Sequence, residues 1–143
     1  MTGASVGIKD IGHCGLYVSD LEATRAFYVG VLGMQEVARP ASFTFPGTWF
    51  ASGRAQLHAI VELEPGRVRE YARVRPSGRE LTEGFWTHVS LEVEDVDAAA
   101  RLVQERGVPV VGGPILRSDG VKQFYILDPD GYMLELWSHA GDR

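Results

Sequence analysis

Four polar side chains stand alone on otherwise apolar, β-prone stretches of this sequence, and their types are those that bind metal ions. They are His13, His58, His88 and Glu135. Two imidazoles and one carboxylate that leave coordination positions open are the ligands that enzymes use for divalent iron, manganese or zinc. A metal held in this way polarises a substrate oxygen or activates water or dioxygen. The sequence therefore predicts an open metal site made by His13, His88 and Glu135.

His58 fits three roles near such a site. It is a fourth ligand, a general acid–base beside the metal, or a structural residue, since a lone histidine on a strand is ordinarily a packed or surface residue. Two observations favour a metal site over ordinary packing. His13 and His88 occupy equivalent points of an internal repeat, and a buried Glu135 carboxylate is costly without a cation.

The internal repeat covers both halves of the chain. The segment IGHCGLYVSDLEATRAFY aligns with WTHVSLEVEDVDAAARLV, which starts 75 residues later. Each copy predicts a strand, an aspartate N-cap (Asp20 or Asp95) and an amphipathic helix that ends at a glycine (Gly33 or Gly107). Three short β-prone runs follow each helix, so the order βαβββ occurs twice.

This order predicts an α+β fold in which two βαβββ modules form a curved mixed sheet, with a concave metal site and helices on the outer face. A chain of 143 residues fits one domain. Module 1 covers about residues 8–63, a linker covers residues 64–84, and module 2 covers about residues 85–140. Neither half can bury its sheet and helix well alone, so the halves pack on each other or across a dimer.

Strand alternation sorts the candidate ligands onto one face. The apolar set that includes Val89 and Leu91 should pack under the helix, which leaves His88 on the open face. The repeat predicts the same for His13, and His58 and Glu135 take equivalent places on the last strand of each module. A pseudo-two-fold axis between the modules would bring the four positions to one point.

The linker is rich in arginine, and it has two interpretations. It is either a solvated connector with a short helix near residues 68–74, or a lid that carries positive charge towards an anionic substrate. Its arginines are Arg67, Arg69, Arg73, Arg75 and Arg79.

Composition excludes several classes of partner. The net charge is −5 and the other arginines are dispersed, which argues against nucleic acid as the main partner. No stretch approaches the roughly 20 apolar residues of a membrane span. The N-terminus lacks the pattern of a secretory signal, and the single Cys14 cannot form an intrachain disulfide, so we expect a cytoplasmic protein.

The repeat and its motifs resemble the vicinal oxygen chelate superfamily, which includes glyoxalase I, extradiol ring-cleaving dioxygenases, fosfomycin-resistance thiol transferases and bleomycin-resistance proteins. The resemblance covers residues 11–138 and is carried by GHCGLYVSDLEATRAFYVGVLGM, THVSLEVEDVDAA and FYILDPDGYMLEL. It implies a small substrate that chelates a metal through oxygens, and a homodimer. It also implies metal ligands at His13, His58, His88 and Glu135.

Extradiol dioxygenases are the leading subtype within this resemblance. They bind iron with two histidines and one glutamate, and their catalytic histidine stands where this chain has His58. Their substrate-contacting tyrosine matches Tyr125. The resemblance thus implies Fe²⁺ as the metal, with Zn²⁺, Mn²⁺ or Ni²⁺ as alternatives, and catalytic roles for His58 and Tyr125. We expect substrate contacts from Gln123, Trp137 and Arg117.

Other chemistries of the superfamily stay open. Glyoxalase I carries a glutamate where His58 stands, and the fosfomycin-resistance transferases resemble residues 117–120 and the FYILDPDG stretch. The first alternative is therefore a metal-dependent isomerase, lyase or thiol transferase. The second alternative is a non-catalytic resistance protein that binds a small molecule.

Overall fold

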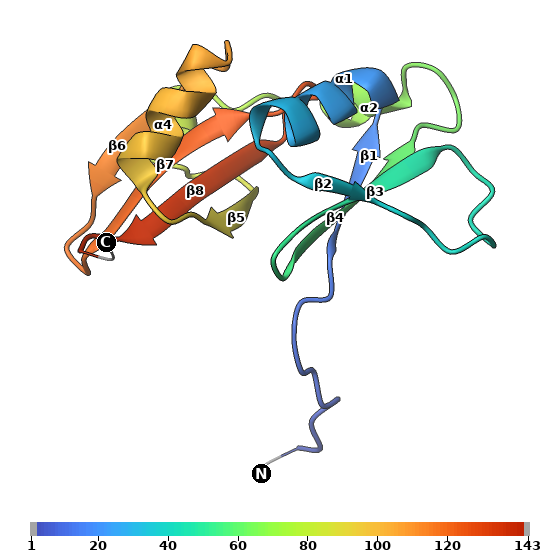
Figure 1. The fold of residues 1–143 in the computed structure, drawn as a ribbon, viewed down its shortest axis with the longest axis horizontal. Helices are drawn as coiled ribbons and strands as arrows, with labels where there is room; N and C mark the ends of the chain where they lie inside the picture. The colour runs from blue at the N-terminus through green and yellow to red at the C-terminus, as the bar shows by residue number, and fades with distance from the viewer. Residues whose placement is uncertain (1–2, 142–143) are drawn as a thin grey trace.

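Within residues 3–141, eight strands form two four-stranded sheets (Figure 1). The computed structural model describes residues 3–141. The strands of the first sheet are β1 (Cys14–Val18), β2 (Gln35–Val37), β3 (Gly47–Ser52) and β4 (Ala55–Val61). Those of the second sheet are β5 (His88–Glu92), β6 (Gly112–Leu116), β7 (Val121–Leu127) and β8 (Met133–His139).

The two sheets have the same topology. The strand orders are β1-β4-β3-β2 and β5-β8-β7-β6. The first and last strands of each module run parallel, and the other neighbours are antiparallel. The predicted α+β fold with two βαβββ modules is therefore confirmed. The strands stay in two hydrogen-bonded sheets and do not join into one continuous sheet.

Each module carries one helix between its first two strands. In module 1, α1 (Leu21–Arg25) continues into the π-helical segment η1 (Ala26–Val31), and in module 2 the helix is α4 (Val96–Glu105). The Oδ1 atoms of Asp20 and Asp95 each accept from the backbone amide three residues later, at 3.0 and 2.9 Å. Gly33 and Gly107 follow the helices with φ angles of 74° and 83°. The predicted caps and stops are confirmed.

One hydrophobic core joins the two modules. Tyr28 and Phe50 from module 1 and Phe124 and Ile126 from module 2 are fully buried and belong to the same cluster. Full burial of a side chain of this size contributes about 1.5–3 kcal/mol. Because the helix-facing sides of both sheets are filled by this core, the opposite, open faces are left for function.

The turn after β7 connects the modules through buried and partly buried hydrogen bonds. Asp128 Oδ2 accepts from the Tyr28 hydroxyl at 3.0 Å, and Asp130 Oδ1 accepts from the Ser19 hydroxyl at 2.5 Å. The Tyr132 hydroxyl donates to a carbonyl of β1 at 2.7 Å. The sequence DPDGY is therefore more than a tight reversal, because it ties module 2 to module 1.

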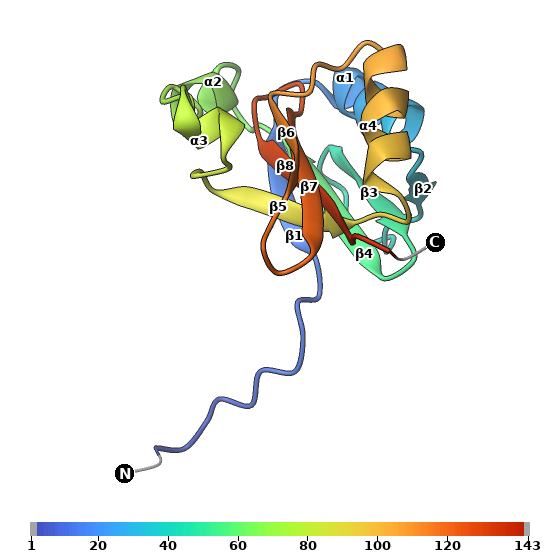
Figure 2. The same cartoon turned by 90° about the vertical axis from the view of Figure 1, so that its left-hand side faces the viewer.

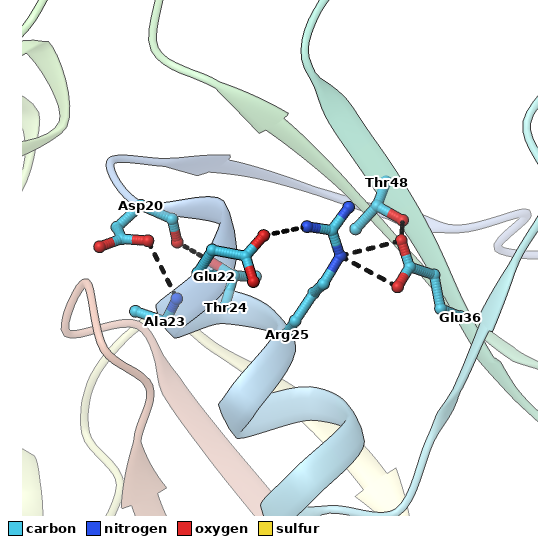
Figure 3. A network of polar contacts seen from close by, with 7 residues as sticks. All are labelled: Asp20, Glu22, Ala23, Thr24, Arg25, Glu36 and Thr48. Carbon is cyan, nitrogen blue, oxygen red and sulfur yellow. Dashed lines mark hydrogen bonds and ion pairs between the residues drawn. The ribbon is translucent and has the colours of Figure 1, made fainter.

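A polar network fastens the edge strand β2 to α1 (Figure 3). Arg25 Nε lies 3.0 Å from Glu36 Oε2, and Arg25 also pairs with Glu22. Glu36 accepts from the Thr48 hydroxyl at 2.5 Å, and this bond, with Arg25, lowers the pKa of Glu36. Since Glu36 and Thr48 point to the helix side, strand alternation turns Trp49 to the open face.

Residues 64–84 form two short helices, α2 (Arg67–Tyr71) and α3 (Arg79–Thr82). Figure 2 shows them together on one side of the molecule, next to the start of β5. Before α2, the Glu62 carboxylate accepts from the amides of Gly66 and Val68, at 2.9 and 2.7 Å. No helix within residues 3–141 is long and apolar enough to cross a membrane.

Three arginines of this connector make separate contacts. Arg67 pairs with Glu70, and Arg79 pairs with Glu83. Arg75 donates to the backbone carbonyl of residue 130 at 2.5 Å. These contacts fit a solvated connector that docks on the turn after β7.

Candidate metal centre

Two predicted ligands meet on the open face of the second sheet. His88 Nε2, at the start of β5, lies 3.2 Å from Glu135 Oε2, in the middle of β8. These strands are parallel neighbours, and their register places Glu135 opposite Ser90. The Ser90 hydroxyl donates to Glu135 Oε1 at 3.1 Å. One carboxylate oxygen is thus held by a hydroxyl, while the other faces the imidazole.

The protonation of the His88 ring follows from its second contact. Nδ1 lies 2.7 Å from the Trp86 carbonyl oxygen. A carbonyl only accepts, so Nδ1 carries a proton, and in a neutral ring Nε2 presents its lone pair to Glu135. Either a proton on Nε2, which makes the ring a donor to Glu135, or a metal ion between the two atoms would make this contact favourable.

The spacing is compatible with a metal ion and equally with a hydrogen bond from a protonated Nε2. Two N or O ligands at about 2.1 Å from one ion lie roughly 3.0–3.4 Å apart at octahedral or tetrahedral angles. The 3.2 Å between His88 Nε2 and Glu135 Oε2 falls in this range. A backbone carbonyl on the far nitrogen of a ligating histidine is also the usual support for such a ligand. His88 and Glu135 are therefore two candidate ligands.

The Glu135 side chain is largely buried. Its residue is 9% exposed. Among residues 3–141, its ion-pair partner is His88, and neither lysine nor arginine pairs with it. A buried carboxylate without a charge partner costs several kcal/mol.

The other two predicted ligands lie on the first sheet. The rings of His13 and His58 are stacked with centroids 3.9 Å apart and planes 16° apart. On its other side His58 stacks on Trp49 at 3.9 Å and 2°, and its Nε2 lies 3.3 Å from Gln56 Oε1. Burial, and then the nearby His13, lower the pKa of His58. The neutral His58 ring is therefore favoured at pH 7, and a neutral ring can coordinate a metal or accept a proton.

The four candidates do not form one site within residues 3–141. In this part of the chain, no group of three or more His, Cys, Asp or Glu side chains is placed to hold a metal ion. The pairs His13–His58 and His88–Glu135 lie on different sheets. In addition, two nearly parallel imidazoles direct their in-plane lone pairs side by side, so His13 or His58 must turn before both can bind one ion.

The strand registers nevertheless make the two pairs equivalent. In the second sheet, Ser90 faces Glu135, which faces Tyr125. In the first sheet, Gly15 faces His58, which faces Trp49. His58 and Glu135 therefore occupy the same place in the repeat, as strand alternation predicts. Trp49 and Tyr125 also correspond, although the alignment of the first strands alone does not reveal it.

The predicted substrate-contacting residues lie beside Glu135. Gln123 and Tyr125 stand on the open face of β7, and Trp137 stands half-buried on β8, opposite Gln123. Arg117 lies in the turn before β7, where it pairs with Asp119 at 2.6 Å. The structure therefore gathers these residues around the second-sheet pair and away from His58.

Tyr125 is covered by the connector. Its exposed fraction is 2%, and a Cβ atom added to Gly84 would lie only 2.2 Å from the Tyr125 Cζ atom. Burial, and then the negative Glu135, raise the pKa of Tyr125 to about 12. Gly84 is a site neighbour that sequence reasoning missed, because nothing local in the linker predicts which strand it will cover.

Comparison with known proteins agrees with this architecture. Residues 10–136 match the family model of the Glyoxalase/Bleomycin resistance protein/Dioxygenase superfamily. The chain is 23% identical over 136 residues to "Glyoxylase I 4" of Arabidopsis thaliana, covering 94% of this chain and 73% of that protein. It is 27% identical over 129 residues to a lactoylglutathione lyase of Salmonella typhimurium, covering 87% and 88% of the two chains.

A solved structure shares the fold. It is that of a putative glyoxalase family protein from Bacillus anthracis, with a TM-score of 0.72 and 23% identity. The alignment covers 95% of this chain and 99% of that chain. With its paired βαβββ modules and a family match over nearly its whole length, the chain belongs to the Glyoxalase/Bleomycin resistance protein/Dioxygenase superfamily, which is the vicinal oxygen chelate superfamily.

Proposed function

We propose that this chain is a divalent-metal-dependent enzyme whose small substrate binds the metal through adjacent oxygens. The observation that carries the proposal is the contact between His88 Nε2 and Glu135 Oε2 at 3.2 Å. Two acceptors at this distance, one on a buried carboxylate and one on a ring whose other nitrogen is already satisfied, are arranged as ligands of one cation.

The roles of the remaining residues follow from their chemistry. His88 and Glu135 would hold the ion together with His13, and His58 would complete the coordination or move a proton at the substrate. When bound, the metal supplies Lewis-acid polarisation of the substrate oxygens. Trp49 and its edge-on neighbour Phe43, whose ring centroids are 5.5 Å apart, give the apolar part of a substrate a wall beside His58.

Two reaction classes compete within this proposal. Two histidines, one glutamate and a further histidine favour extradiol-type dioxygenation with Fe²⁺. The relative named lactoylglutathione lyase favours a lyase or isomerase with Zn²⁺, Ni²⁺ or Mn²⁺. The native metal separates the two, because only the dioxygenase needs a redox-active ion that binds dioxygen.

We further propose that a homodimer completes the site, so that the His13–His58 pair of one chain faces the His88–Glu135 pair of another. Each sheet offers two ligands on its open face, and neither pair alone fills a site. The chain also exposes apolar side chains that a partner would cover. Val6, Ile8 and Ile11 are more than 80% exposed on an N-terminal segment that extends away from both sheets (Figures 1 and 2).

Metal analysis of protein purified without chelator tests the enzyme proposal. We expect near-stoichiometric metal, and at least about a 100-fold loss of affinity in His88→Ala, because one ligand and its support are removed. The matched control is His139→Ala, which removes an exposed histidine of the same module and should keep wild-type affinity. Failure of wild-type protein to bind any added divalent metal would refute the enzyme and leave small-molecule sequestration.

A further inference from the structure

A chain of polar side chains runs from the protein surface to the Glu135 carboxylate. Arg117 Nη1 lies 3.2 Å from Gln123 Oε1, and Gln123 Nε2 lies 2.5 Å from the Tyr125 hydroxyl. Tyr125 on β7 stands directly opposite Glu135 on β8. Arg117 is half-exposed, whereas the exposed fractions of Gln123 and Glu135 are 8% and 9%.

The donors and acceptors of these side chains allow only one direction for the hydrogen bonds. A guanidinium only donates, so Gln123 must turn its amide oxygen to Arg117 and its amide nitrogen to Tyr125. An amide nitrogen also only donates, so the Tyr125 oxygen must accept. The single phenol proton is then left for Glu135, which stands directly opposite Tyr125 on the neighbouring strand.

The Tyr125 hydroxyl is closed to a substrate from the other side. The Gly84 backbone lies against the phenol, and the side chain is 2% exposed. A group that must react with or bind a substrate needs access to it, and this one faces only protein. The geometry therefore separates Tyr125 from the reacting atoms.

We propose that Arg117, Gln123 and Tyr125 form a one-way hydrogen-bond relay that fixes the orientation of the Glu135 carboxylate, and that Tyr125 is a positioning residue. The inference rests on the proposed metal function, because the carboxylate so oriented is the proposed ligand. It reassigns Tyr125, Gln123 and Arg117 from substrate contact to support of Glu135.

The first module provides an independent parallel. Trp49 takes the same register position as Tyr125 and stacks on His58 at 3.9 Å, while Gln56 holds the His58 Nε2 atom. In both modules, an aromatic residue of the third strand immobilises the candidate ligand of the fourth strand. Supporting groups of this kind typically change metal affinity about 10–100-fold when they are removed.

Titration with Co²⁺ tests the relay, with binding measured by calorimetry and ligand geometry by the visible absorption of the bound ion. We expect Tyr125→Phe to bind Co²⁺ about 10–100-fold more weakly and with an altered spectrum, since the carboxylate loses the donor opposite it on β7 and keeps only the Ser90 hydroxyl. The matched control is Tyr28→Phe, which loses a buried hydroxyl contact to Asp128 instead. It should keep the wild-type affinity and spectrum even if its thermal stability falls.

Variants of Arg117, the half-exposed end of the relay, test it at a residue whose replacement should not disturb folding. Arg117→Met should weaken Co²⁺ binding by a similar factor, and Arg117→Lys, which can still donate to Gln123, should restore part of the affinity. Wild-type affinity and spectrum in both Tyr125→Phe and Arg117→Met would overturn the relay while leaving the metal site intact. Failure of the wild-type protein to bind Co²⁺ would overturn the metal site, and the relay with it.

Discussion

Asp128 is the buried acid that holds the two modules at their junction. Its carboxylate accepts from the Tyr28 hydroxyl and from the amides of Asp130 and Tyr132, at 3.0, 3.0 and 2.9 Å. Burial nevertheless dominates these hydrogen bonds and raises the pKa of Asp128 to about 6. The residue is 6% exposed, so the charged form is poorly solvated in the folded protein.

This shift makes folding depend on pH. Between the unfolded pKa of about 3.9 and the folded value of about 6, only the folded state keeps the proton. The stabilising contribution is therefore complete below about pH 4 and lost as the pH rises to about 6, by at most about 3 kcal/mol. Asp128→Asn, which keeps the acceptor for the two amides, should remove this pH dependence. Urea unfolding of metal-free protein from pH 4 to 7 measures it.

An exposed carboxylate serves as the control for Asp128→Asn. Asp10 has a side chain that is 72% exposed, so Asp10→Asn should leave the pH profile of the wild-type protein unchanged. If the unfolding free energy of Asp128→Asn changed with pH between 4 and 6 in the same way as that of the wild-type protein, the raised pKa of Asp128 would be contradicted.

At the scale of elements, the connector shapes the candidate site more than its charges suggest. Arg67 and Arg79 pair with nearby glutamates, and Arg75 contacts the turn after β7. Its last residues lie over the second sheet, where Gly84 contacts Tyr125 and where α3 carbonyls closely approach Gly112. The connector is therefore a cover of β6 and β7, and the glycines allow its close approach.

We predict that Gly84→Ala destabilises the protein by about 2–4 kcal/mol. Gly84 has a φ of 70°, which costs a substituted alanine about 1 kcal/mol, and the new methyl group would overlap the Tyr125 ring. Chemical unfolding measures the loss. The control is Gly53→Ala, which also has a positive φ of 53° but has no atom within 4 Å of the added carbon. Equal losses in the two variants would show that Gly84 does not press on Tyr125.

In the whole molecule, the proposed metal site depends on which two sheets come together. The two modules of one chain share a core on their helix sides, and each sheet keeps two candidate ligands on its open side. A two-fold dimer would unite unlike sheets from two chains and would create two identical sites.

Subunit mixing distinguishes a shared site from a site closed within one chain. His13→Ala removes a candidate ligand from the first sheet, and His88→Ala removes one from the second. If the site is shared, refolding an equal mixture should restore about a quarter of the wild-type Co²⁺ sites, because half of the dimers are mixed and each has one intact site. If each chain closes its own site, none is restored. A mixture of His88→Ala and Glu135→Ala is the control, since both break the second sheet and neither arrangement allows rescue.

The sequence alone determined the repeat, the order of elements, the helix caps and the faces of the strands. These features depend on neighbouring residues, since Asp20 and Asp95 cap amides three positions away and strand alternation has a period of two. Because strand alternation is local, it predicts that His88 and Glu135 lie on the open face, although it does not predict their contact.

Which of these residues meet depends on tertiary packing. The His88–Glu135 contact joins residues from two parallel strands, the stack of His13 on His58 joins the two ends of module 1, and Gly84 reaches Tyr125 through the connector. Such contacts depend on the packing of distant elements and on backbone angles that no local pattern specifies. Strand alternation is local, so the four candidate ligands can be identified in the sequence. Their assembly into one site depends on how whole sheets pair, which is not a local property.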